Sequence, residues 1–347
     1  MTVKNKTVLV TGTTGFIAQH IVDKLLQKKY RVIGTARSEI KYQPLLKEYK
    51  NKYLNCEIIF EIVEDISIDN AFDEIFIKHP EIIYVIHTAS PFIYGLNKPL
   101  EDSFLKPAVD GTLNILKAIS KYAPQVTNVV LTSSFAAIKQ MGKSYTTHIH
   151  SNKSWNLINW NAVKNETDAY IASKAYAEKE ARKFYEKENS NFKLATVNPT
   201  YVFGPQCFDN LVGPILNVSN EILNTITKID KDNKLPQVIF GALAIDVRDV
   251  AEFHIKAIED PKLFSERIFI ASEPVTGQKV LDILNSSCND LQGKIAKGDP
   301  TMTQQLIDEN CPKYDISNII NLIGGYEFIT LKQSLCDVFE QYFRMNS

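Results

Sequence analysis

The stretch TVLVTGTTGFIAQHI, residues 7–21, predicts a short strand rich in β-branched residues, then a glycine turn, then the start of a helix with apolar residues at helical spacing. Gly12 permits a tight turn, Gly15 lets a diphosphate approach the backbone, and the small Ala18 lets the helix pack against the strand. Two glycines alone would also fit an ordinary strand-to-helix turn. Their place after a strand and before a helix, whose first N–H groups can bind an anion, predicts a dinucleotide-binding site.

Strands and helices alternate through the residues that follow. Apolar, β-branched runs predict strands at 31–36, 56–63, 82–89, 127–134 and 193–198. Helical spacing predicts helices at 16–28, 39–50, 69–78, 100–121 and 168–188. This order favours an α/β fold with a doubly wound parallel sheet, the Rossmann arrangement, with right-handed crossovers and helices on both faces.

Glycine and proline residues interrupt this regularity beyond Pro199. We expect a dinucleotide-binding Rossmann domain over 1–203, rejoined by 237–272, where the chain returns to the sheet domain at 239–259 and adds a strand at 267–272. We expect 204–236 and 273–347 to form a smaller C-terminal substrate lobe, with a helix near 215–227, a polar linker at 228–236 and a last helix at 331–344. The polar segment 139–167 is expected to be a loop that covers the site.

The composition argues against several classes of partner. The 39 Lys and Arg residues balance 40 Asp and Glu residues, so no net field attracts nucleic acid or an anionic membrane. The chain shows neither the apolar core of a signal peptide nor a run long enough to span a bilayer, so we expect a cytoplasmic protein. Its five cysteines lack a C-x-x-C pair, which favours reduced thiols. His148 and His150 have no acid or Cys cluster beside them, so we expect no metal site.

The end of the second predicted strand, TARSEIK, bears on the choice of cofactor. NAD enzymes usually place an acid there to hold the ribose 2′-hydroxyl. Here Arg37 can bind a 2′-phosphate through its guanidinium fork, and Lys41 adds a charge one helical turn later, which favours NADPH over NADH. Asp65, after the third strand, could bond the adenine amino group or cap the next segment, and the sequence leaves both open.

Two candidates for proton chemistry follow. Ser133 and Ser134 close the fifth strand at the edge where such sheets bind ligands. Adjacent strand residues face opposite ways, so only one of the two can point into the site. Tyr170 and Lys174, in YIASK, lie four apart at the head of a helix-forming segment and therefore on one helical face. A second match, YGLNK at 94–98, contains glycine and precedes a proline, which disfavours a helix there.

The motifs TGTTGFIAQHI, TARS, HTASPF, LTSSFAA, YIASK, NPTYVFGPQ and IDVRDVA together resemble the extended short-chain dehydrogenase/reductase family, in particular its dihydroflavonol-reductase-like branch. The resemblance implies a catalytic triad of Ser134, Tyr170 and Lys174. It implies cofactor contacts at Gly12, Thr14, Gly15, Phe16, Ile17, Arg37, Lys41, Asp65, Ile66, Thr88, Tyr170, Lys174, Val202 and Ser219.

The resemblance also suggests that Phe92, Phe135 and Tyr201 border the substrate. With Phe208, these aromatic residues suit an apolar pocket for aryl or branched aliphatic carbonyls, although aromatics in strand-end loops also fit a core. Phe135 stands where related reductases carry Tyr, which affects the polarity of the pocket. Ala18 replaces a third glycine, as is common in the family.

These observations predict an enzyme, an NADPH-dependent reductase of aldehydes or ketones, with methylglyoxal, branched aliphatic aldehydes, aryl ketones and diketones as candidate substrates. Tyr170 would deliver the proton, Ser134 would orient the carbonyl oxygen, and Lys174 would favour the tyrosinate. The alternatives are a nucleotide-sugar epimerase or dehydratase of the same fold and a non-catalytic NADP-sensing regulator. We expect a monomer or a homodimer that binds a small carbonyl compound.

Arg37→Asp is expected to weaken NADPH binding ~10-fold or more, because it replaces the guanidinium fork with a carboxylate that repels the 2′-phosphate. Fluorescence titration with NADPH, and with NADH in parallel, measures the effect. NADH affinity should change much less. Unchanged NADPH affinity would contradict the assignment of Arg37 to the 2′-phosphate.

Overall fold

The computed structural model describes residues 6–90, 95, 98–140, 147–188, 190–229 and 241–346. The chain forms two compact units. The first contains Met1–Met141, Lys153–Asn198 and Ala251–Ile268, and the second contains Gly142–Asn152, Pro199–Val250 and Phe269–Ser347. The domain boundaries expected from the sequence remain a prediction, and residues 142–152, 199–203 and 241–250 group with the second unit.

The central sheet has seven strands in the order β10-β7-β5-β4-β1-β2-β3. The strands are β1 (Thr7–Thr11), β2 (Arg31–Ala36), β3 (Ile58–Ile62), β4 (Ile82–His87), β5 (Asn128–Thr132), β7 (Lys193–Pro199) and β10 (Arg267–Ile270). The pairs from β3 to β7 are all parallel. The predicted α/β doubly wound fold is therefore confirmed, and each of these strands was predicted to within about two residues at its ends.

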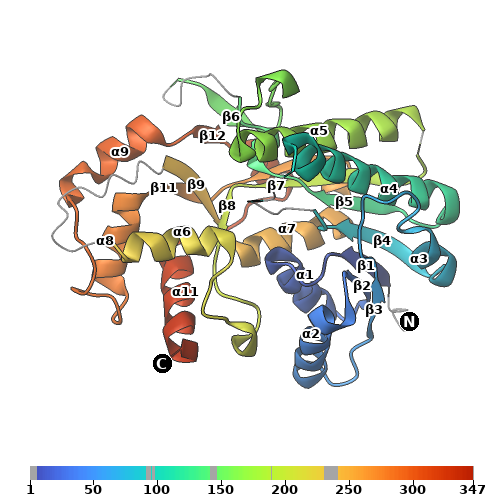
Figure 1. Ribbon diagram of the computed structural model, residues 1–347, viewed down its shortest axis with the longest axis horizontal. Helices are drawn as coiled ribbons and strands as arrows, with labels where there is room; N and C mark the ends of the chain where they lie inside the picture. The colour runs from blue at the N-terminus through green and yellow to red at the C-terminus, as the bar shows by residue number, and fades with distance from the viewer. Residues whose placement is uncertain are drawn as a thin grey trace. The chain divides into compact units, whose positions relative to one another are not determined.

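Helices cover both faces of this sheet (Figure 1). One face carries α3 (Asp73–Lys78), α4 (Lys106–Tyr122), which a π-helical turn at Glu101–Leu105 precedes, and α5 (Glu166–Lys187). The other face carries α1 (Phe16–Gln27), α2 (Glu39–Lys52) and α7 (Val247–Glu259). Polar contacts join the second group: the Tyr49 hydroxyl donates to the Gln19 carbonyl at 2.8 Å, and Lys24 pairs with Glu252 at 2.9 Å.

The strand order reverses between β1 and β4. Thr11 and His87 pair in register at the carboxyl ends of these two strands. The chain leaves β1 toward a helix on one face of the sheet and leaves β4 toward a helix on the other face (Figure 1). In doubly wound sheets this reversal is where ligands bind, so the fold points to the segments that follow Thr11 and His87.

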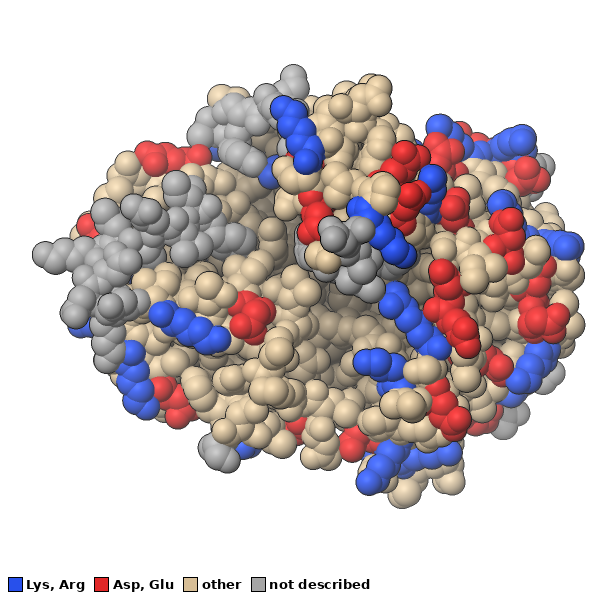
Figure 2. Space-filling view, viewed as in Figure 1, with Lys and Arg blue, Asp and Glu red and all other residues tan. Residues whose placement is uncertain are grey.

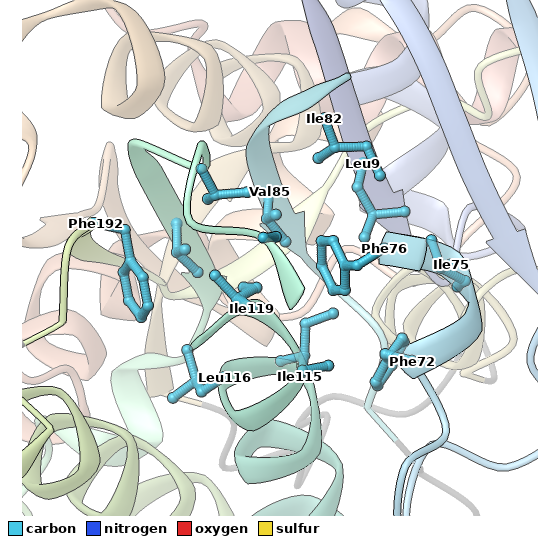
Figure 3. Packing of buried hydrophobic residues seen from close by; sticks show 14 of the residues in the cluster. Leu9, Phe72, Ile75, Phe76, Ile82, Val85, Ile115, Leu116, Ile119 and Phe192 are labelled. Carbon is cyan, nitrogen blue, oxygen red and sulfur yellow. The ribbon is translucent and has the colours of Figure 1, made fainter. Parts of the chain in front are cut away.

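A hydrophobic core lies between the sheet and helices α3 and α4 (Figure 3). Leu9 on β1 and Val85 on β4 pack with Phe76 on α3 and with Ile115 and Ile119 on α4. All five residues of β1 are buried, because helices cover the sheet on both faces. The helix α4 contributes its apolar stripe to this core, as its helical spacing predicts.

The second unit has its own small sheets and core. β8 (Tyr201–Phe203) runs parallel to β9 (Gly241–Asp246), and β11 (Glu273–Thr276) is antiparallel to β9. β6 (Ile149–Ser151) pairs with β12 (Lys313–Asp315). The helices are α6 (Val218–Thr227), α8 (Gly277–Ser287), α9 (Thr303–Asn310), α10 (Ser317–Leu322) and α11 (Leu331–Asn346). The core joins β8 and β9 to α6, α8 and α11 through Phe203, Leu223, Ala244, Leu281 and Leu335.

Two expectations are corrected. The segment 139–167 is not a loop throughout, because β6 pairs with β12 from the far end of the chain, and α5 already begins at Glu166. The stretch 239–259 does not return to the Rossmann sheet as a whole, because β9 belongs to the three-stranded sheet of the second unit. Most of the predicted linker, 230–236, and Phe92 lie outside the described residues.

Basic and acidic side chains are interspersed over the face of the molecule shown in Figure 2. This mixture agrees with the nearly balanced charge of the sequence. Within the described part of the chain, none of the helices combines the length and the apolar character that a bilayer-crossing segment needs.

Phe76→Ala is expected to lower the free energy of unfolding by about 3–5 kcal/mol, because it leaves a cavity between α3 and the sheet. Phe76 is 1% exposed, whereas its neighbour Ile77 on the same helix is 53% exposed. Ile77→Ala is therefore the matched control and should cost about 0.5 kcal/mol or less. Urea unfolding of both variants measures the difference, and equal costs would contradict this description of the core.

Candidate active site

The glycine turn after β1 has the backbone that its sequence predicts. Gly12 has a φ of +67°, and a Cβ atom there would lie 2.8 Å from the Cα of Ala89, so neither the conformation nor the space admits a side chain. The Gly15 N–H donates to the Gly12 carbonyl at 2.9 Å. Gly15 is also the N-cap of α1, and no described side chain caps this helix or places an acid in its first turn. The first N–H groups of α1 therefore suit a phosphate.

Threonine side chains fix this turn against the neighbouring strands. The N–H and the hydroxyl of Thr13 both donate to the Thr35 carbonyl on β2 at 2.9 Å. The hydroxyl of Thr88, a predicted cofactor contact, donates to the Thr11 carbonyl at 2.5 Å. The Thr11 hydroxyl in turn accepts from the Ala89 N–H at 3.1 Å. The ends of β1, β2 and β4 are thus held together around the glycine turn.

The predicted residues for the adenosine end lie at the ends of β2 and β3. Arg37 directly follows β2 and is exposed, as is Lys41 in the first turn of α2. Asp65 Oδ1 accepts hydrogen bonds from the Ser67 hydroxyl at 2.7 Å and the Ser67 N–H at 2.8 Å. These bonds, with a contribution from the Arg37 charge, lower the pKa of Asp65. Asp65 therefore caps a local turn, and its contact with adenine remains a prediction.

Ile66, the neighbour of Asp65, was also predicted to contact the cofactor. Its carbonyl accepts from the Asn114 side-chain amide of α4 at 3.1 Å. A Cβ atom on Gly111 of the same helix would lie 2.6 Å from the Ile66 Cδ1. Ile66 is thus packed between the end of β3 and α4.

The two serines at the end of β5 have different partners. Ser133 is buried, and its hydroxyl donates to Glu178 Oε2 on α5 at 2.5 Å. Ser134 is partly exposed and is the N-cap of a 3-10 turn, Phe135–Ala137, where its hydroxyl accepts from the Ala136 N–H at 3.1 Å. Of the two serines, therefore, only Ser133 donates its hydroxyl proton to a buried side chain, that of Glu178. The Ser134 hydroxyl retains its proton for another acceptor.

Tyr170 and Lys174 lie in the first half of α5, and the Asn165 side chain caps this helix by accepting from the Asp168 N–H at 2.9 Å. Tyr170 is partly buried. The Lys174 ammonium donates to the Ser90 hydroxyl at 3.1 Å. This bond ties the helix to the segment that follows β4. Burial lowers the pKa of Lys174 to about 8, so the side chain remains mostly charged at neutral pH.

A small cavity of about 30 Å³ lies beside Lys174. Its lining includes His87 at the end of β4, Ser133 at the end of β5 and Glu178 on α5. The cavity shows that the end of β5 and the helix carrying Tyr170 and Lys174 meet in one place. Of these lining residues, the sequence analysis assigned Lys174 to the site and considered Ser133 only as the alternative to Ser134; it did not single out His87, Ser90 or Glu178.

His87 stays neutral in this environment. Its Nδ1 lies 2.8 Å from the Thr11 hydroxyl, whereas its Nε2 has no hydrogen-bond partner among the described residues. Burial, reinforced by the nearby Lys174 charge, lowers the pKa of His87 to about 3. The sequence signal for this residue was its place in the HTAS segment at the carboxyl end of a buried strand, which is the ligand-binding edge of the sheet.

Of the remaining predicted residues, one directly follows Ser134 and three belong to the second unit. Phe135 is partly exposed in the 3-10 turn after β5, and Phe92 lies outside the described residues. In the second unit, Tyr201 is 44% exposed and its ring stacks against Phe203. The Ser219 hydroxyl donates to the Val202 carbonyl at 2.5 Å, so these two predicted cofactor contacts bond to each other.

Two further expectations concern packing and metals. Phe208, considered for the pocket, is 7% exposed and belongs to the buried residues of the second unit. His148 and His150 lie edge to face with ring centroids 4.7 Å apart. Over the described residues, no group of three or more His, Cys, Asp or Glu side chains is arranged to hold a metal ion.

Comparisons with known proteins agree with the motifs. The model of the NAD dependent epimerase/dehydratase family matches residues 8–271. The chain is 40% identical over 342 residues to the NADPH-dependent methylglyoxal reductase GRE2 of Saccharomyces cerevisiae, covering 96% of this chain and 97% of that protein. It is 35% identical over 295 residues to ketoreductase azaE of Aspergillus niger, covering 85% of this chain and 86% of that protein.

The fold also matches a solved structure over almost its full length. The crystal structure of Gre2 from Candida albicans in complex with NADPH has a TM-score of 0.92 and 40% identity, covering 98% of this chain and 99% of that chain. The motifs above indicated a likeness to yeast NADPH-dependent methylglyoxal reductase, also described as 3-methylbutanal reductase. That likeness is confirmed.

Lys174→Met is expected to change how stability depends on pH in the ligand-free protein. The unfolded chain holds the Lys174 proton up to a pKa of 10.5, whereas the folded protein releases it at about 8. Between these values the unfolded state binds more protons, so Lys174 makes stability rise with pH. The free energy of unfolding of the wild type minus that of the variant should therefore increase between about pH 7.5 and pH 10.

Urea unfolding of both proteins at a series of pH values measures this difference, in which other titrating groups cancel. Lys→Met keeps most of the unbranched apolar stem of the side chain and removes the charge. A difference that stays constant, or decreases, over this range would contradict the desolvated state of the Lys174 ammonium.

Proposed function

The chain belongs to the NAD dependent epimerase/dehydratase family, and on this premise we propose that it is an NADPH-dependent carbonyl reductase. The oxidoreductase class and the cofactor rest on its similarity to an NADPH-dependent methylglyoxal reductase and a ketoreductase, and to a Gre2 structure that contains NADPH. The site residues of this chain support the finer proposal. In it, Tyr170 donates a proton to the carbonyl oxygen of an aldehyde or a ketone.

The bond between Lys174 and Ser90 is the observation that carries this proposal. It joins α5 to the carboxyl end of β4, next to the point where the order of the strands reverses. Tyr170 precedes Lys174 by one helical turn, so its side chain projects from the same face of α5. A phenol and a charged ammonium are therefore held at the edge of the sheet that binds ligands.

The glycine turn fits the diphosphate of a dinucleotide. A Cβ atom on Gly12 would meet the backbone of Ala89, and the start of α1 offers N–H groups that no described side chain caps. Arg37 and Lys41 add positive charge beyond β2, where a 2′-phosphate would lie. When bound, NADPH supplies the hydride that reduces the carbonyl carbon.

Lys174 makes the tyrosine a usable acid. An unperturbed tyrosine has a pKa of ~10, so a shift of 2 to 3 units, worth roughly 3 to 4 kcal/mol, suits proton transfer near neutral pH. The Lys174 ammonium favours the tyrosinate that forms when the proton leaves. Burial of this ammonium strengthens the interaction, because little water screens the charge.

Ser134 orients the substrate oxygen in this proposal. The Ala136 N–H donates to its hydroxyl oxygen and thereby restrains the Ser134 side chain at the start of the 3-10 turn. The Ser134 hydroxyl then donates a hydrogen bond to the carbonyl oxygen of the substrate, while Tyr170 transfers a proton to the same oxygen. Phe135 follows directly and supplies apolar surface, which favours methylglyoxal, branched aliphatic aldehydes, aryl ketones or diketones over sugars.

A nucleotide-sugar epimerase or dehydratase of the same fold would retain tightly bound NAD. Arg37 disfavours such an enzyme, because an acidic residue usually holds the ribose of NAD at the end of the second strand. A non-catalytic regulator would not need a tyrosine and a desolvated lysine on one face of a helix. NADPH oxidation with a panel of aldehydes, ketones and diketones, with NADH in parallel, separates these functions. If no carbonyl compound consumes NADPH, the reductase proposal is wrong.

Tyr170→Phe is expected to lower kcat ~100-fold or more while NADPH still binds, because the change removes only the hydroxyl that donates the proton. Tyr176→Phe is the matched control on the same helix. The Tyr176 hydroxyl accepts from the Trp160 N–H at 3.2 Å, outside the proposed site, and its loss should leave kcat within about twofold. Steady-state kinetics with NADPH titration measures both, and an active Tyr170→Phe variant would exclude Tyr170 as proton donor.

A further inference from the structure

Glu178 lies one helical turn after Lys174 on α5, and its side chain is 1% exposed. No part of the mechanism above uses it. We propose that Glu178 is a positioning residue for Ser134, through the hydrogen bonds that its carboxylate accepts from Ser133 and Asn198. This inference rests on the proposed function, because it takes Ser134 as the residue that orients the substrate.

One oxygen of the carboxylate serves the end of β5. Glu178 Oε2 accepts from the Ser133 hydroxyl at 2.5 Å and from the Asn198 side-chain amide at 2.7 Å. The same amide nitrogen of Asn198 donates to the Ser134 carbonyl at 3.2 Å. Glu178 therefore fixes the residue before Ser134 directly and fixes the Ser134 backbone through one intermediate side chain.

The other oxygen is held by a buried cation. Glu178 Oε1 accepts from Arg267 Nε on β10 at 2.5 Å, and the Arg267 guanidinium lies 3.6 Å from the ring centroid of Trp155. The guanidinium also donates to the Ser154 carbonyl at 2.6 Å. Both ions are almost fully buried, so each needs the other to offset its desolvation. This pairing prevents the carboxylate from moving away from Ser133.

The 3-10 turn after Ser134 is held by neighbouring contacts. The Asn156 N–H and side-chain amide donate to the Ala137 carbonyl at 2.9 Å and the Ala136 carbonyl at 2.8 Å. Residues 134–137 thus lie between Asn156 on one side and the network around Glu178 on the other. The direction of the Ser134 hydroxyl depends on this turn, because the Ala136 N–H binds its oxygen.

Glu178→Gln preserves the shape of the side chain but not its acceptors. An amide has one acceptor oxygen and one NH₂ donor, so a donor must face either Arg267 Nε or the Ser133 and Asn198 pair. It also leaves the Arg267 charge buried without a counterion. Either outcome loosens the end of β5. A displacement near 1 Å at a reacting group can cost ~100-fold in rate.

Arg182→Met is the matched control. Arg182 lies one turn beyond Glu178 on α5 and donates to Thr196 and to the Glu266 carbonyl, both at 3.4 Å. It belongs to the same buried polar region, but its hydrogen bonds within the described part of the chain go to Ser265, Thr196 and Glu266 and not to Ser133, Ser134 or Asn198. Both variants should be less stable than the wild type. Only Glu178→Gln should lower kcat, by about tenfold or more, with the KM for NADPH within about twofold.

The pH profile separates positioning from a direct electrostatic effect. Burial lowers the pKa of Lys174, and the Glu178 carboxylate is hydrogen-bonded to Ser133, Asn198 and Arg267. If Glu178 only positions Ser134, Glu178→Gln lowers kcat/KM at every pH and leaves the apparent pKa values of the kcat/KM profile as in the wild type. A profile that moves instead would overturn the proposal, as would a kcat equal to that of Arg182→Met.

Backbone amide exchange tests the proposal without activity. Exchange in peptides that cover 134–138 should accelerate in Glu178→Gln and stay as in the wild type in Arg182→Met, because only the first variant disturbs the bonds to Ser133 and Asn198 that hold this turn. Unchanged exchange in Glu178→Gln would overturn the positioning role. If the wild type reduces no carbonyl compound, the proposed function fails, and this exchange measurement still decides whether Glu178 holds the turn.

Discussion

Gly12 and Ala89 approach each other where the carboxyl ends of β1 and β4 lie side by side, and a Cβ atom on Gly12 would lie only 2.8 Å from the Ala89 Cα. This contact brings the turn before α1 next to the segment that follows β4. Ser90, the next residue, is the hydrogen-bond partner of Lys174. A single close approach of two backbones therefore connects the glycine turn that suits a diphosphate with the helix that carries Tyr170. The rest of the candidate site, including Lys174 and Tyr170, depends on this close approach of Gly12 and Ala89.

Lys174 and Glu178 lie one turn apart on α5, carry opposite charges and have different partners. None of the ion pairs among the described residues includes Lys174, and its neighbours Ser90 and His87 are neutral. Glu178, which could neutralise it, is instead bound to Arg267. The ammonium therefore remains desolvated, at a cost in stability, and in the proposed mechanism its charge acts on the phenol of Tyr170.

The two serines after β5 also have different partners. Ser133 directly follows β5 and donates to the buried carboxylate of Glu178, whereas Ser134 lies at the start of a 3-10 turn. Four segments far apart in the sequence fix this turn: β7 through Asn198, β10 through Arg267, the segment around Asn156, and α5. Such a network is rigid when every member is paired, which suits the role proposed for Ser134.

The sequence by itself determined the Rossmann strands, the glycine turn and the shared face of Tyr170 and Lys174, because these features depend on spacing within a few residues. The choice between Ser133 and Ser134, the carboxylate of Glu178 and the neutral state of His87 were decided only by the tertiary structure. So were the pairing of β6 with β12 and the place of β9 in the second sheet. The physical reason is that segments far apart in the chain supply the hydrogen-bond partners and the desolvated environment of these residues. Local periodicity does not predict which distant segments come into contact.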